Sequence, residues 1–357
     1  MRTRWMPALA ALVLLAGCQD KGGEAADPGS PAAPGETAAE SSDLDRPELE
    51  SAGVIKEHAY TAPYTGLGMA ESPDMRPVLV TINNHPKARP QSGLAEADVV
   101  YEMLAEGEIT RLLALYQSKL PEKIGPVRSA RDYFVGLAGA HDALYIAHGY
   151  SPDAQAMLET GAVDHLNGMR YDGTLFKRSS DRVAPHNSYI SKDAVRNGAD
   201  QNGFRMKIGS DPGWRFGEEP AVSAGSAGTI EVSYGRDPAF ESHYSFDPHA
   251  GTYSRSTGGT ATADAESGEE PALANILVLE APHRIIDDKG RRAIDFGAGG
   301  AAAVFRGGQV FETEWQSRDG VPTVMDGSLP FPLAPGKTWI HIVPDSPGME
   351  DSVSYTP

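Results

Sequence analysis

Residues 76–131 contain four short signatures, which are Ala88-Arg-Pro-Gln-Ser-Gly-Leu94, Glu96-Ala-Asp-Val-Val-Tyr-Glu102, Ile109-Thr-Arg111 and Ile124-Gly-Pro-Val-Arg-Ser-Ala-Arg131. The whole chain of 357 residues has a formal net charge of -18, yet this stretch holds eight Lys and Arg against six Asp and Glu. Positive charge is therefore concentrated in it, and a site for a negatively charged group is expected here first.

Apolar runs in and after this stretch predict β-strands, because they are rich in β-branched and aromatic residues. They cover residues 78–82, 99–104, 112–116 and 144–147. Helical patterns at residues 129–140, 152–159 and 192–202 alternate with them. Glu106-Gly107-Glu108 predicts a hairpin turn between the second and third strands, so we expect a mixed sheet covered by helices.

The later part of the chain predicts mainly β structure. Its strands are expected at residues 229–234, 242–246, 252–256, 276–280, 302–305, 310–315 and 338–343. Residues 258–271 form an acidic low-complexity insertion, which we expect to be an exposed loop without function. Residues 209–228 are rich in Gly, Pro and Ser, and the acidic excess begins there, which favours a domain boundary.

The predicted fold class is α+β, with two domains. An N-terminal domain with a mixed sheet and helices, expected as a layered β/β/α sandwich, covers residues 58–213. A linker at residues 214–228 leads to a smaller β-rich C-terminal domain at residues 229–345, and residues 346–357 form a tail.

The beginning of the chain predicts a bacterial lipoprotein. Residues 1–17 have charged residues before an apolar run too short to span a bilayer, as in a signal peptide. The run ends in Leu15-Ala-Gly-Cys18, a lipobox, and Cys18 is the only cysteine. Residues 18–57 hold ten acidic against three basic groups and predict a disordered tether. We expect acyl chains (palmitate) on Cys18 and anchoring at the extracytoplasmic face of the cell membrane; an ordinary secretory signal is the alternative.

Arg128 and Arg131 are the leading candidates for ligand binding. Ser129 and Asp132 fit a capped helix start, which predicts that both arginines lie beside the unpaired N–H groups of a helix N-terminus. Guanidinium groups bind phosphate or carboxylate in bidentate fashion, and Arg89 and Arg111 are candidates for the same site. The alternative is that these arginines pair with acidic side chains of their own domain.

Carboxylates form a second candidate group. Asp98, Glu102 and Glu106 are spaced by four residues, which predicts that they share one face of their segment, and Glu96 precedes them. Together with the arginines they form a charged cluster that is either catalytic or, as the more frequent case, a structural network of ion pairs.

Two loops are expected near these residues. Pro90 and Gly93 predict a loop at residues 88–94, and Arg182 with residues 185–189 predicts a second loop that could close over the first. The second loop supplies His186 and Asn187 as candidate ligand-binding residues, with a purely structural histidine as the alternative.

Standard catalytic motifs are absent from the sequence. We find no Gly-x-Ser-x-Gly, His-Glu-x-x-His, Walker or dinucleotide-binding motif, and the ten histidines have no metal-ligand spacing. We therefore expect no cofactor and no metal. The acidic balance outside the basic stretch argues against a nucleic-acid partner.

The motifs together resemble the YerB-like family of bacterial lipoproteins, a family of unknown function with N- and C-terminal parts (domain of unknown function 3048). The resemblance rests on the signatures above and on Arg76-Pro-Val, Asn84, Pro185-His-Asn187, Trp315 and Leu333-Ala-Pro-Gly-Lys-Thr-Trp-Ile340. It implies an α+β first domain of two sheets and helices, followed by a smaller β-rich domain, and no established activity. Asn83 stands where the family pattern usually has Asp, and Glu108 where it usually has Gly.

We expect a non-enzymatic binding module that is anchored to the membrane through Cys18. Its arginines would hold an anionic cell-envelope polymer or a segment of a partner protein. Two alternatives remain open. One is a hydrolase or phosphotransferase that acts on phosphorylated cell-envelope polymers, loosely similar to the LytR-CpsA-Psr phosphotransferases. The other is a protein-protein scaffold.

Overall fold

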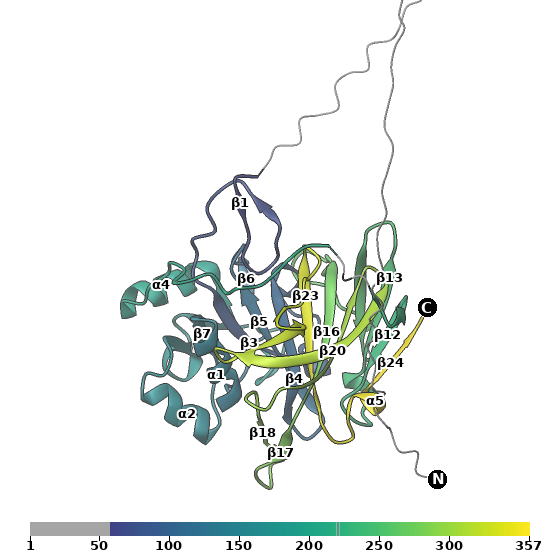
Figure 1. The fold of residues 1–357 in the computed structure, drawn as a ribbon. Helices are drawn as coiled ribbons and strands as arrows, with labels where there is room; N and C mark the ends of the chain where they lie inside the picture. The colour runs from purple at the N-terminus through teal and green to yellow at the C-terminus, as the bar shows by residue number, and fades with distance from the viewer. Residues whose placement is uncertain (1–57, 219, 221) are drawn as a thin grey trace, which may run out of the picture. The chain divides into compact units, whose positions relative to one another are not determined.

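The computed structural model describes residues 58–218, 220 and 222–357, so the predicted signal peptide, Cys18 and the tether lie outside the described residues. The central strands of its main sheet follow the spatial order β8-β7-β3-β5-β4-β23-β16-β19-β20-β21 (Figure 1). Their bounds are β3 Val78–Asn83, β4 Val99–Glu106, β5 Ile109–Tyr116, β7 Leu144–Ala147, β8 His165–Asn167, β16 Leu273–Ala281, β19 Gly300–Arg306, β20 Gln309–Arg318, β21 Val321–Asp326 and β23 Lys337–Pro344.

Strand directions in this sheet are mixed, as the sequence predicts. β4 and β5 form an antiparallel hairpin whose turn is Gly107 and Glu108. β23 lies between β4 and β16 and pairs in parallel with both, so it joins the N-terminal and C-terminal regions of the chain within one sheet.

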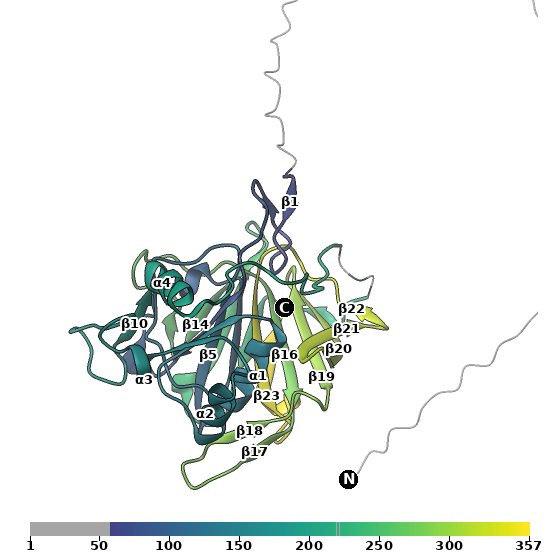
Figure 2. The same cartoon turned by 90° about the vertical axis from the view of Figure 1, so that its left-hand side faces the viewer.

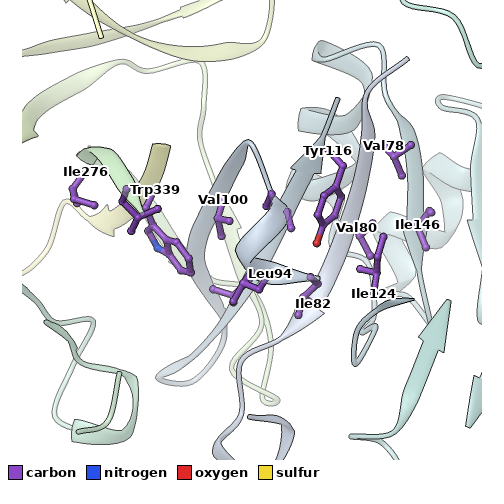
Figure 3. Packing of buried hydrophobic residues seen from close by; sticks show 14 of the residues in the cluster. Val78, Val80, Ile82, Leu94, Val100, Tyr116, Ile124, Ile146, Ile276 and Trp339 are labelled. Carbon is purple, nitrogen blue, oxygen red and sulfur yellow. The ribbon is translucent and has the colours of Figure 1, made fainter. Parts of the chain in front are cut away.

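One row of residues crosses the sheet and explains why these strands pack together. Val80, Ala114, Val100, Trp339 and Ile276 are successive Cα partners on β3, β5, β4, β23 and β16, and all are buried. Figure 3 shows Trp339 between Ile276 and Val100. The run of apolar residues on this face therefore fixes the register, because a shift by one residue would turn the row to the other face.

Helices and a second group of strands cover the two faces of the sheet. α1 (Asp132–Ala140) and α2 (Pro152–Glu159) bury their apolar residues with those of one face, and Figure 2 shows them in front of the strands. α4 (Lys192–Asn202) packs on the opposite face. The same face is covered by β12 Thr229–Val232, β13 Ser242–Asp247, β14 Thr252–Thr257 and β24 Val353–Thr356.

The remaining elements are short. The strands are β1 Tyr60–Thr61, β2 Gly68–Met69, β6 Lys123–Ile124, β9 Phe176–Arg178, β10 Ser188–Ser191, β11 Gly225–Ser226, β15 Thr260–Ala261, β17 His283–Ile285, β18 Arg292–Ile294 and β22 Leu329–Pro330. The helical turns are α3 Gly168–Tyr171, α5 Met349–Ser352 and the 3-10 turns Pro86–Ala88, Leu94–Glu96 and Pro238–Phe240. Among the described residues, no helix is both long enough and apolar enough to cross a membrane.

The predicted α+β class is confirmed, and α2 and α4 have the predicted bounds. The predicted helix start at Ser129 is wrong, because α1 begins at Asp132. Ser129 and Ala130 stay extended instead: the backbone N–H of Ala130 donates to Gly149 O, and the Ser129 hydroxyl donates to His148 O. Pairing with the residues after β7 therefore outweighs the local preference for a cap.

The expectation of an exposed loop at residues 258–271 is also wrong in part. Thr262 and Asp264 are buried, and Asp264 Oδ2 accepts a hydrogen bond from the backbone N–H of Gly93 at 2.5 Å. Glu266 accepts one from the Ser92 hydroxyl at 2.8 Å. The partners of these contacts are distant in the sequence, so the polar composition of the segment alone did not reveal that it packs against residues 91–93.

Candidate functional site

Glu106, Arg111 and Arg131 form one ionic group at the end of β4. Arg111 Nη2 donates to Glu106 Oε1 at 2.9 Å, and Arg131 Nη2 donates to Glu106 Oε2. Both guanidinium groups are almost completely buried, whereas Glu106 is partly exposed. Burial alone would raise the pKa of Glu106, but the charges of Arg111, Arg131 and Arg128 together outweigh it and hold this pKa below its ordinary value. Glu106 therefore stays ionised at neutral pH.

The two buried arginines together carry one more unit of charge than the single carboxylate that they share. Burial lowers the pKa of Arg111 to about 10, and the nearby positive charge of Arg131 acts in the same direction. Arg111 Nη1 donates to the carbonyl of Ser129 at 2.8 Å, but Arg131 Nε is buried without a partner among the described residues. The group thus keeps unused positive charge and donor capacity.

Arg128 lies beside this group, and its backbone is held from both sides. Its N–H donates to Thr81 O of β3 at 2.8 Å, and its carbonyl accepts from His148 N at 2.8 Å. The side chain is half-buried, and within the described part of the chain it has no hydrogen bond or ion pair. Burial lowers the pKa of Arg128, Glu106 opposes this shift, and Arg131 adds to it. Arg128 is therefore a cation with a fixed backbone whose guanidinium has no hydrogen-bond or ion-pair partner among the described residues, although the charge of Glu106 acts on it.

Two histidines from different loops stand near Arg128. The rings of His85 and His186 lie 4.7 Å apart between centroids, and Asn83 Nδ2 is 2.9 Å from His186 Nδ1. Burial lowers the pKa of both histidines, and Arg128 is among the cations that lower each of them further. The rings are consequently uncharged near pH 7, and protonation at lower pH would add positive charge next to Arg128.

The loop that carries His186 closes over the first loop, as the sequence indicates. Arg182 Nη1 donates to Ala88 O and Arg182 Nη2 donates to Pro90 O, both at 2.7 Å. Asn187 fixes the same loop from within, since it accepts from Arg178 Nη1 and donates to Ser179 O, both at 3.1 Å. Asn187 is therefore a structural part of the loop in the contacts described, whereas His186 lies at the basic group.

Arg89 does not join the other three arginines. Its guanidinium donates to Asn84 O at 2.7 Å and lies 5.5 Å from the centroid of the Phe240 ring. Burial lowers the pKa of Arg89 to about 10, followed by the charge of Arg255, which places it near a different ionic group. The structure thus gathers Arg111, Arg128 and Arg131. Arg89 has its own partners, although its charge, like that of Arg128, lowers the pKa of His85.

The four carboxylates also have separate environments. Glu96 pairs with Lys119, and Asp98 accepts from the backbone N–H groups of Gln117 and Ser118 at 2.6 and 2.8 Å. The expectation that Glu102 and Glu106 share one face is wrong, because β4 has a bulge between Leu104 and its last residue, which turns Glu106 to the face of Arg111.

Glu102 is the centre of a fully buried network that the sequence did not reveal. Its Oε2 accepts from Arg255 Nη2 at 2.8 Å and from the Trp339 indole at 3.1 Å. Asn84 and the Thr110 hydroxyl donate to its Oε1 at 3.0 and 2.9 Å. Burial raises the pKa of Glu102, but Arg255, His341, Arg89 and the hydrogen bond from Thr110 together outweigh it, so the net shift is downward. Both carboxylate oxygens are saturated by the protein, which makes this network structural.

The position of the helix N-terminus changes the expected site. Arg131 is the residue before α1, it caps the helix with no side-chain hydrogen bond, and Asp132 stands in the first turn. The acidic side chain of Asp132 takes the favourable place near the positive end of the helix dipole. The helix end is therefore already next to an acidic side chain, and Arg128 lies three residues ahead of the helix cap.

Sequence reasoning missed His85 and His148 near this group. His85 precedes Pro86 within the motif block, but a single histidine carries no spacing pattern that could identify it. His148 Nδ1 lies 2.7 Å from the Ser188 hydroxyl, and Arg178 Nη2 donates to its Nε2 at 3.0 Å. The contact joins segments 30 residues apart, which only the fold brings together.

Comparisons with known proteins place these residues in a wider group. The family described as "Protein of unknown function (DUF3048) N-terminal domain" matches residues 64–205, and the corresponding C-terminal domain matches residues 230–340. "Putative lipoprotein YerB" of Bacillus subtilis (strain 168) is 46% identical over 287 residues, which are 80% of this chain and 86% of that protein. The crystal structure of YerB protein from Bacillus subtilis matches with a TM-score of 0.77 at 44% identity, covering 84% of this chain and all of that chain.

Proposed function

The chain belongs to the DUF3048 family, as its motifs predict, and this family is described as one of unknown function. We therefore propose a function from the site itself. The protein is a membrane-anchored binding protein that holds a phosphate or carboxylate group of a cell-envelope molecule at Arg128. The observation that carries this proposal is the half-buried guanidinium of Arg128, which has no partner among the described residues.

Charge around Arg128 supports an anionic ligand. Arg111 and Arg131 share one carboxylate, so the group of three arginines and Glu106 has an excess of two positive charges at neutral pH. A charged hydrogen bond from an arginine fork to phosphate or carboxylate is stronger than one between neutral groups, and partial burial reduces its screening by salt. The Nε of Arg131 and the rings of His85 and His186 supply further polar atoms near this place.

Membrane anchoring is supported by the lipobox at Cys18 and by the name of the relative in Bacillus subtilis, a lipoprotein. Cys18→Ser removes the only thiol to which lipid can be attached, so the protein is expected to leave the membrane fraction or to remain an unprocessed precursor. Membrane fractionation with an antibody against the protein measures this. A processed variant that stays in the membrane fraction would contradict lipid anchoring at Cys18.

Calorimetric titration with inorganic phosphate tests the binding site. The full chain with Cys18→Ser is expected to bind phosphate, and Arg128→Gln is expected to abolish binding because it removes the unpaired cation. Arg284→Gln is the matched control, since Arg284 is an exposed arginine on β17, and it should bind as the parent does. Equal phosphate binding by the parent and Arg128→Gln would rule out Arg128 as the site.

A further inference from the structure

A second site lies elsewhere in the molecule, in a pocket of about 250 Å³. It is bounded by the end of α1, by residues 210–215 and by β16, β21 and β23. Its walls include Leu277, Ile340 and Phe331, and the indole of Trp214 stands edge-on to the Tyr64 ring at 5.6 Å. The volume is near the lower limit of small-molecule sites, roughly 300 Å³, and apolar walls with a few polar groups are typical of them.

His141 lines this pocket and is bonded on both ring nitrogens. Its Nδ1 lies 3.2 Å from the Tyr64 hydroxyl, and its Nε2 lies 2.9 Å from the Tyr101 hydroxyl. Burial lowers the pKa of His141 to about 4, so the ring is neutral at pH 7. A neutral imidazole has one donor and one acceptor nitrogen, and the two tyrosines therefore have opposite roles.

Access to the pocket decides which nitrogen carries the proton, because both tyrosines are buried but only Tyr64 lines the pocket. Tyr101 is completely buried, and the ring of His141 is the only hydrogen-bond partner of its hydroxyl among the described residues. A buried O–H without an acceptor loses its hydrogen bonds to water and gains none within the protein, so Tyr101 must donate to Nε2. Nδ1–H then donates to the Tyr64 oxygen, and the Tyr64 proton is left without an acceptor in the described protein.

The charges around the pocket favour an uncharged occupant. Two acidic and two basic side chains line it besides Asp142, and all four are exposed, namely Asp211, Arg215, Arg318 and Asp319. His141 and Tyr64 are neutral at pH 7, and burial raises the pKa of Tyr64 well above its ordinary value. Asp142, the acidic residue next to His141, already pairs with Arg76 and Arg205. An ion held beside His141 would therefore meet apolar walls and no buried counter-charge among the residues that line the pocket, which is unfavourable.

We propose that this pocket binds a small uncharged molecule whose apolar body contacts Trp214 and Phe331 and whose oxygen atom accepts a hydrogen bond from the Tyr64 hydroxyl. The Tyr101–His141 pair is the positioning element, because it sets the direction of the proton on Tyr64. This site is separate from the basic group at Arg128, and it does not depend on the function proposed there.

Two probes of equal shape test the proposal, namely acetophenone, which has a carbonyl oxygen, and α-methylstyrene, which has a methylene group in its place. The indole N–H signals of the full chain with Cys18→Ser are followed by NMR, and Trp214→Phe assigns the signal of Trp214. Acetophenone is expected to shift this signal and to bind about fivefold more tightly than α-methylstyrene, the ratio for one net hydrogen bond. The indoles of Trp315 and Trp339 donate to Glu280 O and Glu102 Oε2, so their signals should not move.

Matched variants separate the hydrogen bond from the apolar contact. Tyr64→Phe is expected to bind both probes with the affinity that α-methylstyrene has for the parent, while Tyr60→Phe, at an exposed tyrosine on β1, should not change either affinity. Val321→Trp, which fills the pocket, should abolish both interactions while leaving the remaining signals in place. The proposal is overturned if acetophenone leaves the Trp214 signal unchanged, or if Tyr64→Phe binds it as tightly as the parent does.

Discussion

Arg128 and Arg131 are three residues apart and have the same charge, but their surroundings give them different roles. Arg131 is buried and bonded to Glu106, so its guanidinium has an ion-pair partner within the protein. Arg128 is half-buried and has no such partner among the described residues. Arg131 is therefore expected to contribute to stability, and Arg128 to ligand binding.

Substitution with glutamine should separate these two roles. Arg131→Gln removes a buried charged hydrogen bond to Glu106, which should lower the free energy of unfolding by about 1–3 kcal/mol. Arg128→Gln removes a cation that is near Arg131 and has no partner, so the change should stay within about 0.5 kcal/mol. Urea unfolding followed by circular dichroism measures both. A loss for Arg128→Gln as large as that for Arg131→Gln would show that Arg128 has a structural partner.

At the scale of the elements, the contact between β4, β14 and β23 depends on one buried ion pair. Glu102 of β4 and Arg255 of β14 are completely enclosed, and the guanidinium lies 4.1 Å from the centroid of the Trp339 ring of β23. Removal of one partner of a buried pair leaves an uncompensated charge, whereas removal of both does not.

A double-substitution cycle tests this ion pair. Arg255→Met leaves Glu102 buried without its cation and should cost about 3–5 kcal/mol of unfolding free energy. Glu102→Gln combined with Arg255→Met should cost less than the sum of the two single changes, because neither charge is then left alone. The measurement is urea unfolding of the three variants, and additive losses would contradict a direct coupling of the two residues.

The segment at residues 258–271 offers a second test at this scale. Asp264 accepts from the backbone N–H of Gly93, and Asp264→Ala would leave that buried donor without an acceptor. Amide exchange of Gly93 should become about 5- to 150-fold faster, since loss of a buried partner costs about 1–3 kcal/mol. Asp247→Ala, at an exposed aspartate at the end of β13, is the control and should leave the Gly93 amide unchanged. An unchanged exchange rate in Asp264→Ala would mean that the segment does not hold residues 91–93.

Local patterns in the sequence predict most of the helices and strands. The features that these patterns miss depend on contacts between residues far apart in the sequence. The β4–β5 hairpin, α2 and α4 follow from the apolar pattern and from Gly107. The bulge in β4 has no such signature, and it decides whether Glu106 faces Arg111 or Glu102. Arg255 lies 153 residues after Glu102, so spacing alone could not identify it as the partner.

At the scale of the whole molecule, the two halves of the chain share their interior. β23 pairs with β4 along five residues, and Tyr234 and Tyr244 hold the buried His341 between them. Both Tyr hydroxyls lie within 2.9 Å of the ring nitrogens. Burial lowers the pKa of His341 to about 4, and the pKa of His141 on the other face of the sheet is lowered to the same value by burial.

Stability should therefore depend on pH in a window set by these two histidines. Their pKa is about 6.5 in the unfolded chain and about 4 in the folded protein. Between these values the unfolded chain binds more protons, so the stabilisation is complete above pH 6.5 and is lost as the pH falls towards 4. Each histidine should contribute about 3 kcal/mol to this loss. Urea unfolding at several pH values measures it.

His341→Gln should flatten this pH dependence by about half, since the amide of Gln does not titrate. The exposed His249 is the matched control, and His249→Gln should leave the curve unchanged. If the free energy of unfolding of the parent is constant from pH 7 to pH 4.5, the two histidines are not buried in the neutral form.

The central claim is that Arg128 holds an external anion, and thermal unfolding in sulfate tests it most directly. The full chain with Cys18→Ser is melted in sodium sulfate and in sodium chloride at equal ionic strength, with and without Arg128→Lys. Sulfate also stabilises proteins in general, so the quantity to compare between the two chains is the rise of Tm in sulfate relative to chloride. We predict a larger rise of Tm in sulfate for the chain with Arg128, because lysine keeps the charge but lacks the bidentate fork. An equal rise in both chains would contradict the claim.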